Sequence, residues 1–147
     1  MMTRATVEIG ASAQRVWEVF TDVERWPSWT PSVTSVEPLD ASSISVGNRF
    51  RIKQPKLPTL VWEVTAVDAS RSWTWVVRSI GATTSATHEI SSKGPSACVV
   101  TQVIDQRGAL GTLVGGLTRR LTRRYLSLEG NGLKTVSEDQ KRHAPQP

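Results

Sequence analysis

The sequence is poor in the residues that carry redox, metal or covalent chemistry. Its 147 residues include one cysteine, Cys98, and two histidines, of which only His88 lies outside the C-terminal tail. A single cysteine excludes an intrachain disulfide, and one histidine without a second histidine or cysteine does not build a zinc site. Cys98 has no basic neighbour in the sequence, which predicts a buried core residue instead of a reactive thiol. We therefore expect no metal and no cofactor.

Long apolar segments are missing as well. The longest uncharged apolar stretch, residues 108–118, has 11 residues, and a membrane span needs about 18. The N-terminus also lacks the features of a secretory signal, so we expect a cytoplasmic protein without a transmembrane segment. Hydrophobic residues make up 38% of the chain, enough for one core. The sequence predicts a single domain over residues 1–141 and a disordered tail at residues 142–147.

The hydrophobic periodicity changes along the chain. Residues 3–9 alternate as a strand does, and Val16, Trp17 and Phe20 then follow helical spacing. Pro27 limits this run, which predicts two short helices between residues 12 and 29. Later segments rich in Val, Ile, Thr and Trp are separated by short turns, as in antiparallel sheets. The predicted strands are residues 3–9, 33–39, 49–54, 60–68, 72–80, 83–91 and 97–106.

The last segment is predicted to be a long amphipathic helix that begins near residues 108–110. Gly130 and Gly132 each cost a helix about 1 kcal/mol relative to alanine, so we expect it to bend or fray there. A seven-stranded sheet curls, and only this helix can cover its concave face. The expected fold class is α+β, a curved antiparallel sheet around the C-terminal helix. The apolar stripe comprises Leu110, Leu113, Val114, Leu117, Leu121, Tyr125 and Leu128.

Five local motifs accompany this order of elements. They are the first helix at 13–20, Trp26-Pro27 with Trp29-Thr30-Pro31, Gly47-Asn48-Arg49-Phe50, Trp62-Glu63-Val64 with Asp68, and the end segment 125–138. Over about residues 3–138 the chain resembles the SRPBCC superfamily (START, Bet v 1-like, helix-grip fold) and its bacterial polyketide cyclase/dehydrase branch. The resemblance implies the helix-grip fold and a pocket for a lipophilic molecule. It does not define an activity, because members bind or process many unrelated molecules.

Tryptophan is the abundant aromatic residue, with six copies beside two phenylalanines and one tyrosine. Its large apolar area suits a ligand cavity as well as a core. Trp62 and Trp75 are expected in the cavity wall, and the pleat places Leu60, Val64 and Ala66 on the same face as Trp62. The candidate ligand-binding residues are Trp26, Trp29, Phe50, Trp62, Val64, Trp75, Val77, His88, Leu113, Leu117, Leu121 and Tyr125.

His88 and Tyr125 are the candidate catalytic residues. His88 shares a strand face with Ile90, in a region that the resemblance places on the cavity side. It can either donate a hydrogen bond that fixes the sheet or a ligand, or act as a general acid or base. Tyr125 can offer a phenol to the cavity, and at its spacing it is equally a core residue. Glu63 and Glu89 are expected to face solvent.

Three functions remain open from the sequence. The first is a binding protein for a lipid, polyketide-like, isoprenoid or aromatic molecule. The second is a polyketide cyclase, aromatase or dehydratase that acts on such a molecule. The third is an interaction module that uses the basic face of the last helix. This face either makes peripheral contact with anionic lipid headgroups or is only a solvated surface. No nucleic-acid motif is present, so no nucleic-acid partner is expected. The basic residues are Arg119, Arg120, Arg123 and Arg124.

Overall fold

The computed structural model describes residues 1–142, which form one antiparallel sheet of seven strands and a long helix. The strand order is β1-β7-β6-β5-β4-β3-β2. This arrangement confirms the predicted helix-grip fold. Of the predicted tail, only Arg142 lies within the described residues, and it ends the last helix. The elements are β1 (Met2–Ile9), α1 (Ala13–Thr21), the 3₁₀ turn η1 (Val23–Arg25), α2 (Trp26–Trp29), β2 (Ser35–Pro38), β3 (Arg49–Lys53), β4 (Leu60–Asp68), β5 (Ser72–Ser79), β6 (Ala82–Ser92), β7 (Cys98–Arg107) and α3 (Ala109–Arg142).

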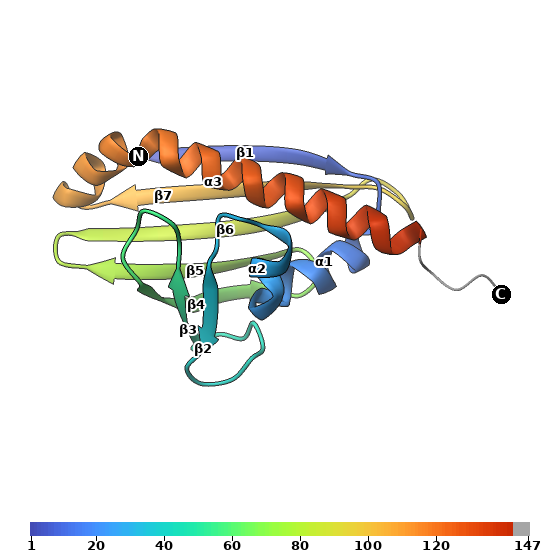
Figure 1. Ribbon diagram of the computed structural model, residues 1–147, viewed down its shortest axis with the longest axis horizontal. Helices are drawn as coiled ribbons and strands as arrows, with labels where there is room; N and C mark the ends of the chain where they lie inside the picture. The colour runs from blue at the N-terminus through green and yellow to red at the C-terminus, as the bar shows by residue number, and fades with distance from the viewer. Residues whose placement is uncertain (143–147) are drawn as a thin grey trace.

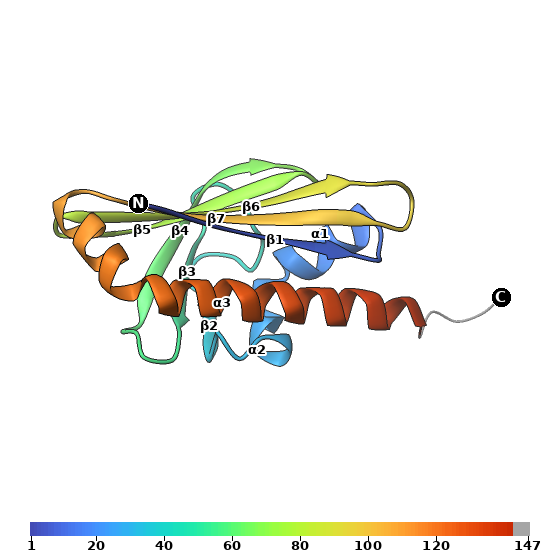
Figure 2. The same cartoon turned by 90° about the horizontal axis from the view of Figure 1, so that it is seen from above.

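Helix α3 lies across one face of the sheet, as the two views at right angles show (Figures 1 and 2). Its length runs along β1, and α1 and α2 contact it near its C-terminal half. The short helices therefore close one end of the space between the sheet and α3. The first turns of α3 and the β5–β6 hairpin lie at the other end of this space.

The two short helices are fixed by local hydrogen bonds and by the core. Ser12 caps α1, because its Oγ accepts a hydrogen bond from the Arg15 backbone N–H at 3.1 Å. Trp26 begins α2, and its indole N–H donates to the Phe20 carbonyl at the end of α1 (2.9 Å). Trp26 and Phe20 are both buried, with their rings stacked at 5.6 Å. The chain reversal near Asp22 is thus part of the hydrophobic core.

Helix α3 does not fray at its two late glycines, in contrast to the sequence-based expectation. A Cβ at Gly132 would lie 2.1 Å from the Trp29 carbonyl oxygen, and one at Gly130 would meet the Val7 side chain at 3.5 Å. Gly132 therefore lets α3 approach α2 closely, Gly130 lies in ordinary contact with β1, and Leu133, next to Gly132, is fully buried. This packing outweighs the low helix propensity of glycine. The helix instead bends in its first turns (Figure 2), where Gly115 and Gly116 are adjacent.

The apolar stripe in the first turns of α3 points away from the sheet. Leu113 and Leu117 are 59% and 79% exposed, so they do not line the cavity in which the sequence analysis expected them. The buried positions in this segment are Gly111 and Gly115. A Cβ at Gly115 would lie 2.6 Å from the Gln106 side-chain oxygen. Small residues face β7 because the helix comes so close to it, and the leucines are left on the outer side.

A bulge in β4 changes the predicted face of Ala66. The pairing with β5 shifts register between Val64 and Ala66, and Ala66 is exposed while Val67 packs against the core. An inserted residue of this kind moves every later side chain to the opposite face of the strand. Trp62 and Val64, which precede the bulge, keep their predicted face.

Truncation of α3 is expected to distinguish its packed half from its exposed first turns. Leu133→Ala should lower the free energy of unfolding by about 2–5 kcal/mol, because it leaves a cavity in the core. Leu117→Ala, the matched change on the same helix, should stay within about 0.5 kcal/mol. Urea unfolding followed by tryptophan fluorescence measures both. Equal losses would show that the two leucines have similar environments, contrary to their exposure.

Candidate functional site

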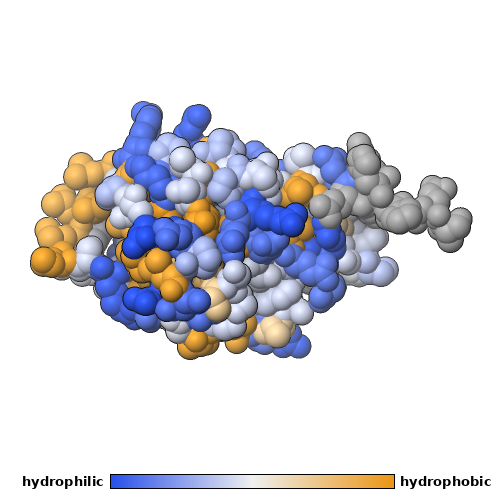
Figure 3. Space-filling view, turned by 60° about the horizontal axis from the view of Figure 1, so that its bottom comes forward, coloured by the Kyte–Doolittle hydropathy of each residue, from blue (hydrophilic) through white to orange (hydrophobic). Residues whose placement is uncertain are grey.

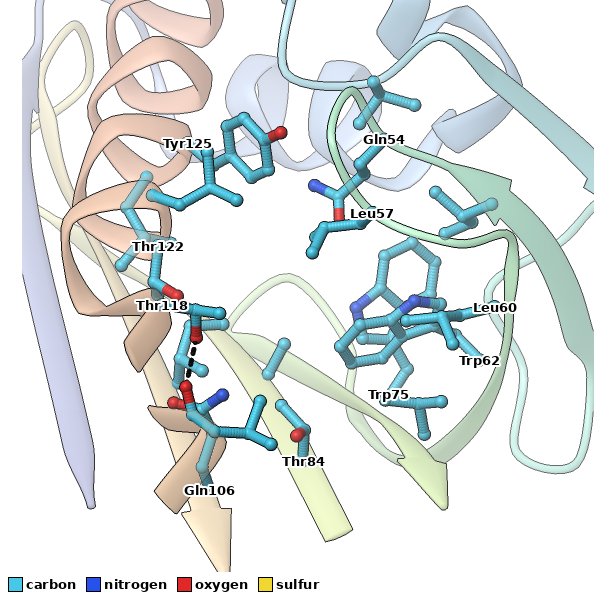
Figure 4. Close-up of a pocket in the computed structure, with 18 of the residues that line it drawn as sticks. Gln54, Leu57, Leu60, Trp62, Trp75, Thr84, Gln106, Thr118, Thr122 and Tyr125 are labelled. Atoms are coloured by element: carbon cyan, nitrogen blue, oxygen red, sulfur yellow. Dashed lines mark hydrogen bonds between the residues drawn. The ribbon is translucent and has the colours of Figure 1, made fainter. Parts of the chain in front are cut away.

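A cavity of about 290 Å³ lies between the sheet and α3. The close-up shows α3 on one side and the segment around Leu57 with the tryptophans on the other (Figure 4). Alternate residues of the sheet form its floor, and one face of α3 forms its cover. The sheet side consists of Ile52, Gln54, Leu57, Pro58, Leu60, Trp62, Trp75, Val77, Ser79, Ala82, Thr84, Ala86, His88, Gln102, Ile104 and Gln106, with Trp26 and Val33. The helix side consists of Gly111, Val114, Thr118, Leu121, Thr122, Tyr125, Leu126 and Glu129.

Strand register arranges the floor in rows. Trp75 pairs with Ala86, and Ala86 pairs with Ile104 of β7, which gives an apolar row. The next row runs from Trp73 through His88 to Gln102. Because side chains alternate along each strand, these rows lie side by side on the concave face. The apolar row therefore has polar side chains on both sides of it, His88 and Gln102 on one side and Thr84 and Gln106 on the other.

The tryptophans form one connected aromatic wall around Trp75. Its ring centroid lies 4.8 Å from that of Trp73, 5.6 Å from Trp26 and 5.7 Å from Trp62. All four side chains are buried. Tilted and edge-to-face contacts at such distances add to the stability of the wall beyond its buried area. The wall therefore presents a preformed apolar surface to the cavity.

His88 is buried and uncharged at neutral pH. Its ring stacks on Trp73 at 3.8 Å, and Nδ1 lies 3.2 Å from the Trp73 carbonyl oxygen. Burial lowers the pKa of His88 from 6.5 to about 3, against a smaller opposing effect of that hydrogen bond. A carbonyl only accepts hydrogen bonds, so Nδ1 carries the hydrogen and Nε2 is left as an acceptor. In a cavity, such a nitrogen can accept a hydrogen bond from a ligand.

Glu129 is a buried carboxyl group that the sequence analysis did not identify. It lines the cavity from α3, one helical turn after Tyr125, and is 7% exposed. Burial raises the pKa of Glu129 from 4.5 to about 8, and a hydrogen bond with Ser32 opposes the shift in part. The carboxyl group is therefore mostly protonated at neutral pH and can donate a hydrogen bond. Its spacing of four residues from Tyr125 was the available signal, because i and i+4 share a helix face.

Tyr125 joins the two sides of the cavity. Its hydroxyl donates a hydrogen bond to the Pro55 carbonyl in the loop between β3 and β4, and burial raises the pKa of the phenol. The hydroxyl is therefore engaged in a structural contact. Thr118 is also engaged, since its hydroxyl donates to the Val114 carbonyl at 2.7 Å, the dashed line in Figure 4.

The structure brings seven of the twelve candidate residues together at the cavity and leaves the other five outside its lining. Leu113 and Leu117 lie on the outer side of α3. Phe50 and Val64 are fully buried in the core cluster, and Trp29 is half-buried against Trp26, with centroids 5.4 Å apart. The lining residues that were missed include Gln102, Gln106 and Thr84 as well as Glu129. The seven candidates in the lining are Trp26, Trp62, Trp75, Val77, His88, Leu121 and Tyr125.

The described part of the chain contains no group of three or more His, Cys, Asp or Glu side chains that could hold a metal ion. Cys98 is buried, and burial raises the pKa of its thiol. Within residues 1–142, none of the helices is long and apolar enough to cross a membrane.

Glu129 and His88 are expected to affect stability in opposite directions as pH changes. Between pH 4.5 and 8 folded Glu129 holds a proton that the unfolded chain has released, so stability falls as pH rises. Between pH 3 and 6.5 the unfolded chain binds a proton that folded His88 does not, so stability rises with pH. The two effects oppose each other from pH 4.5 to 6.5. Above pH 6.5 only the decline due to Glu129 remains.

Glu129→Gln should therefore remove the decline between pH 6.5 and 8, which has a limit of about 1.4 kcal/mol per pH unit. Urea unfolding at several pH values in this range measures the slope. Glu89→Gln, which changes an exposed carboxylate of β6, is the matched control and should retain the decline. A wild-type curve that is flat in this range would contradict the protonated state of Glu129.

Comparison with known proteins places this architecture in a family. The family model described as "Polyketide cyclase / dehydrase and lipid transport" matches residues 2–138. No curated protein matches the chain at a significant level.

Several solved structures share the fold at low sequence identity. A norcoclaurine synthase point mutant from Thalictrum flavum has a TM-score of 0.75 at 13% identity, with 96% of each chain covered. A START superfamily protein from Mycobacterium smegmatis has a TM-score of 0.74 at 18% identity, covering 95% of this chain and 98% of that one. The Zhui aromatase/cyclase from a Streptomyces species has a TM-score of 0.73 at 17% identity, covering 94% and 93%. With the family match spanning nearly the whole chain, the protein belongs to the polyketide cyclase/dehydrase and lipid transport family.

Proposed function

We propose that the protein binds a small, largely apolar molecule that carries a carbonyl or hydroxyl group. The observation that carries the proposal is the cavity of about 290 Å³ between α3 and the sheet, with an aromatic wall and few polar groups. Its volume is at the small end of the range for small-molecule sites, roughly 300–1,000 Å³. A compact ring system suits this space better than a long acyl chain.

The buried polar groups supply orientation. Protonated Glu129 offers a hydrogen-bond donor from the helix side, and Nε2 of His88 offers an acceptor from the floor. Gln102, next to His88 across the β6–β7 ladder, offers both. All three are uncharged at neutral pH, so the cavity favours a neutral ligand with one or two polar atoms. An anionic ligand would bring a charge into a largely apolar space whose lining has no Lys or Arg to pair with it.

Enzymatic turnover is a second candidate function, and Glu129 is the observation that favours it. A carboxylic acid with a pKa of about 8 is suited to proton transfer near neutral pH. In a dehydration, Glu129 would protonate a ligand hydroxyl that leaves as water, and the Glu129 carboxylate so formed would accept the proton from the adjacent carbon. In this role Glu129 takes the place of the candidates His88 and Tyr125, because burial keeps His88 a weak base and the Tyr125 hydroxyl is engaged with Pro55.

Filling the cavity is expected to weaken ligand binding. Ala86 lies in the floor between Trp75 and Ile104, so Ala86→Leu should weaken the binding of the uncharged probe N-phenyl-1-naphthylamine by about fivefold or more. Ser85→Leu, the neighbouring change on the opposite face of β6, should leave the affinity within about twofold. Probe fluorescence titration measures both, and thermal unfolding checks that both variants fold. Equal affinities would place the probe outside the cavity.

Native mass spectrometry of the purified protein tests the proposal directly. A retained molecule should appear as a discrete mass above that of the polypeptide, and the Ala86→Leu variant should lose it. To separate binding from turnover, the molecule identified in this way is incubated with wild type and Glu129→Gln. A carrier should return it unchanged in both cases. An enzyme should convert it, in the forward direction if the molecule is the substrate and in the reverse direction if it is the product. The rate of this conversion should be lower in Glu129→Gln by about 100-fold or more.

A further inference from the structure

One end of the molecule carries large apolar side chains that nothing in the described chain covers. We call Ile80, Leu110, Leu113 and Leu117 the apolar tip, and they are 95%, 47%, 59% and 79% exposed. Hydrophobic residues gather at this end of the space-filling view, on the left of Figure 3. Single exposed leucines are common on protein surfaces, whereas a contiguous group marks an interaction surface.

The apolar tip is one rigid surface built from two segments. The Leu110 backbone N–H donates to the Gly81 carbonyl at 3.0 Å, and a Cβ at Gly81 would lie 2.9 Å from the Leu110 side chain. The β5–β6 hairpin, with Ile80 at its turn, is thus packed on the first turn of α3. Leu113 and Leu117 follow Leu110 at i+3 and i+7 and so continue the same helix face.

Basic side chains continue this helix face. Arg120 and Arg124 follow Leu117 at three and seven residues, and Arg119 and Arg123 lie beside them. All four are exposed. No Asp or Glu occurs between Asp105 and Glu129, so neighbouring positions on the helix do not neutralise this charge. The surface is therefore apolar at its tip and positively charged along its next two turns.

We propose that this end of the molecule docks on an anionic lipid surface. The apolar tip would enter the boundary between headgroups and acyl chains, and the arginines would contact the headgroup phosphates. Charge complementarity decides among the candidate partners. A second copy of the chain on a twofold axis would bring two sets of four arginines together, and a soluble polyanion would leave the apolar tip in water.

The docking surface adjoins the cavity. Ser79, Ala82, Gly111 and Val114 line the cavity at this end, and Val114 is itself 45% exposed. Docking would therefore place the membrane next to this end of the cavity. The inference does not rest on the proposed function, because the apolar tip and the arginines lie outside the polar part of the site.

Vesicle co-sedimentation tests the inference. The full chain should bind phosphatidylcholine vesicles that contain phosphatidylglycerol, bind pure phosphatidylcholine weakly, and lose binding as salt is raised. Leu113→Gln combined with Leu117→Gln should weaken binding by about tenfold or more. Arg119→Gln combined with Arg120→Gln should weaken it by a similar factor and reduce the salt dependence. Exposed side chains change in each case, so all variants are expected to fold.

Matched pairs elsewhere serve as controls. Val46→Gln with Val61→Gln removes two other exposed apolar side chains, and Arg4→Gln with Arg71→Gln removes two other exposed arginines. Both control pairs should bind vesicles as wild type does. The variant with both leucines changed should still bind N-phenyl-1-naphthylamine in the absence of vesicles, which separates docking from ligand binding.

Three results would overturn the inference. The first is equal binding of wild type to anionic and neutral vesicles, or no binding to either. The second is binding that needs the arginines but not the leucines, which would indicate a general polyanion site. The third is a dimer in light-scattering measurements that the leucine changes dissociate, which would assign the apolar tip to a second copy of the chain.

Discussion

The site depends on how α3 is held against a concave sheet. Gly132 lets the helix reach the Trp29 carbonyl near one end, and Gly115 lets it reach Gln106 near the other. Between these contacts the cavity separates part of the helix from the middle strands of the sheet. The cavity is therefore a result of geometry, since close packing at both ends of α3 leaves a space in the middle. Protein interiors are otherwise packed densely, so an unfilled apolar space of this size lowers the stability of the fold.

The two buried titratable groups give this space its chemical character. Glu129 and His88 share the same cause of pKa shift, desolvation, and it drives both toward their neutral forms. A histidine that retains its hydrogen on Nδ1 and a carboxyl group that retains its proton are complementary as acceptor and donor. The site thus offers a hydrogen-bond donor and a hydrogen-bond acceptor at fixed positions without a net charge. The formal net charge of +5 does not enter the cavity, because its lining has no Lys or Arg.

The sequence predicted the fold well because the strands and turns carry strong local signals. Each of the seven predicted strands overlaps an observed one, and the start of α3 was placed within one residue. The face of α3 was the main error. Hydrophobicity alone favoured Leu113 and Leu117 as inward residues, but the positions that face β7 are Gly111 and Gly115, where a Cβ would come within 3.5 Å and 2.6 Å of Gln106 atoms. Only knowledge of the distance between helix and sheet reveals this preference for small side chains.

The chemical part of the site was harder to predict for the same reason. Glu129 was not identified as a site residue, because its burial depends on elements distant in sequence, such as the Ser32 region. The tryptophans of the wall were recognised, since their side-chain type and strand spacing suffice to place Trp62 and Trp75. The bulge after Val64 left no recognisable signal, so the face of Ala66 was misplaced.

The hydrogen bond from Tyr125 to the Pro55 carbonyl has a consequence for the rate of exchange with the cavity. Within residues 1–142, this bond joins α3 to the loop between β3 and β4, which forms the wall of the cavity opposite the helix. One such bond contributes only about 0.5–1.5 kcal/mol net, far less than global unfolding requires. The loop can separate from the helix as a local fluctuation while the sheet stays intact. Residence time and affinity are then governed by different contacts, so a tightly held molecule need not be a slowly exchanging one.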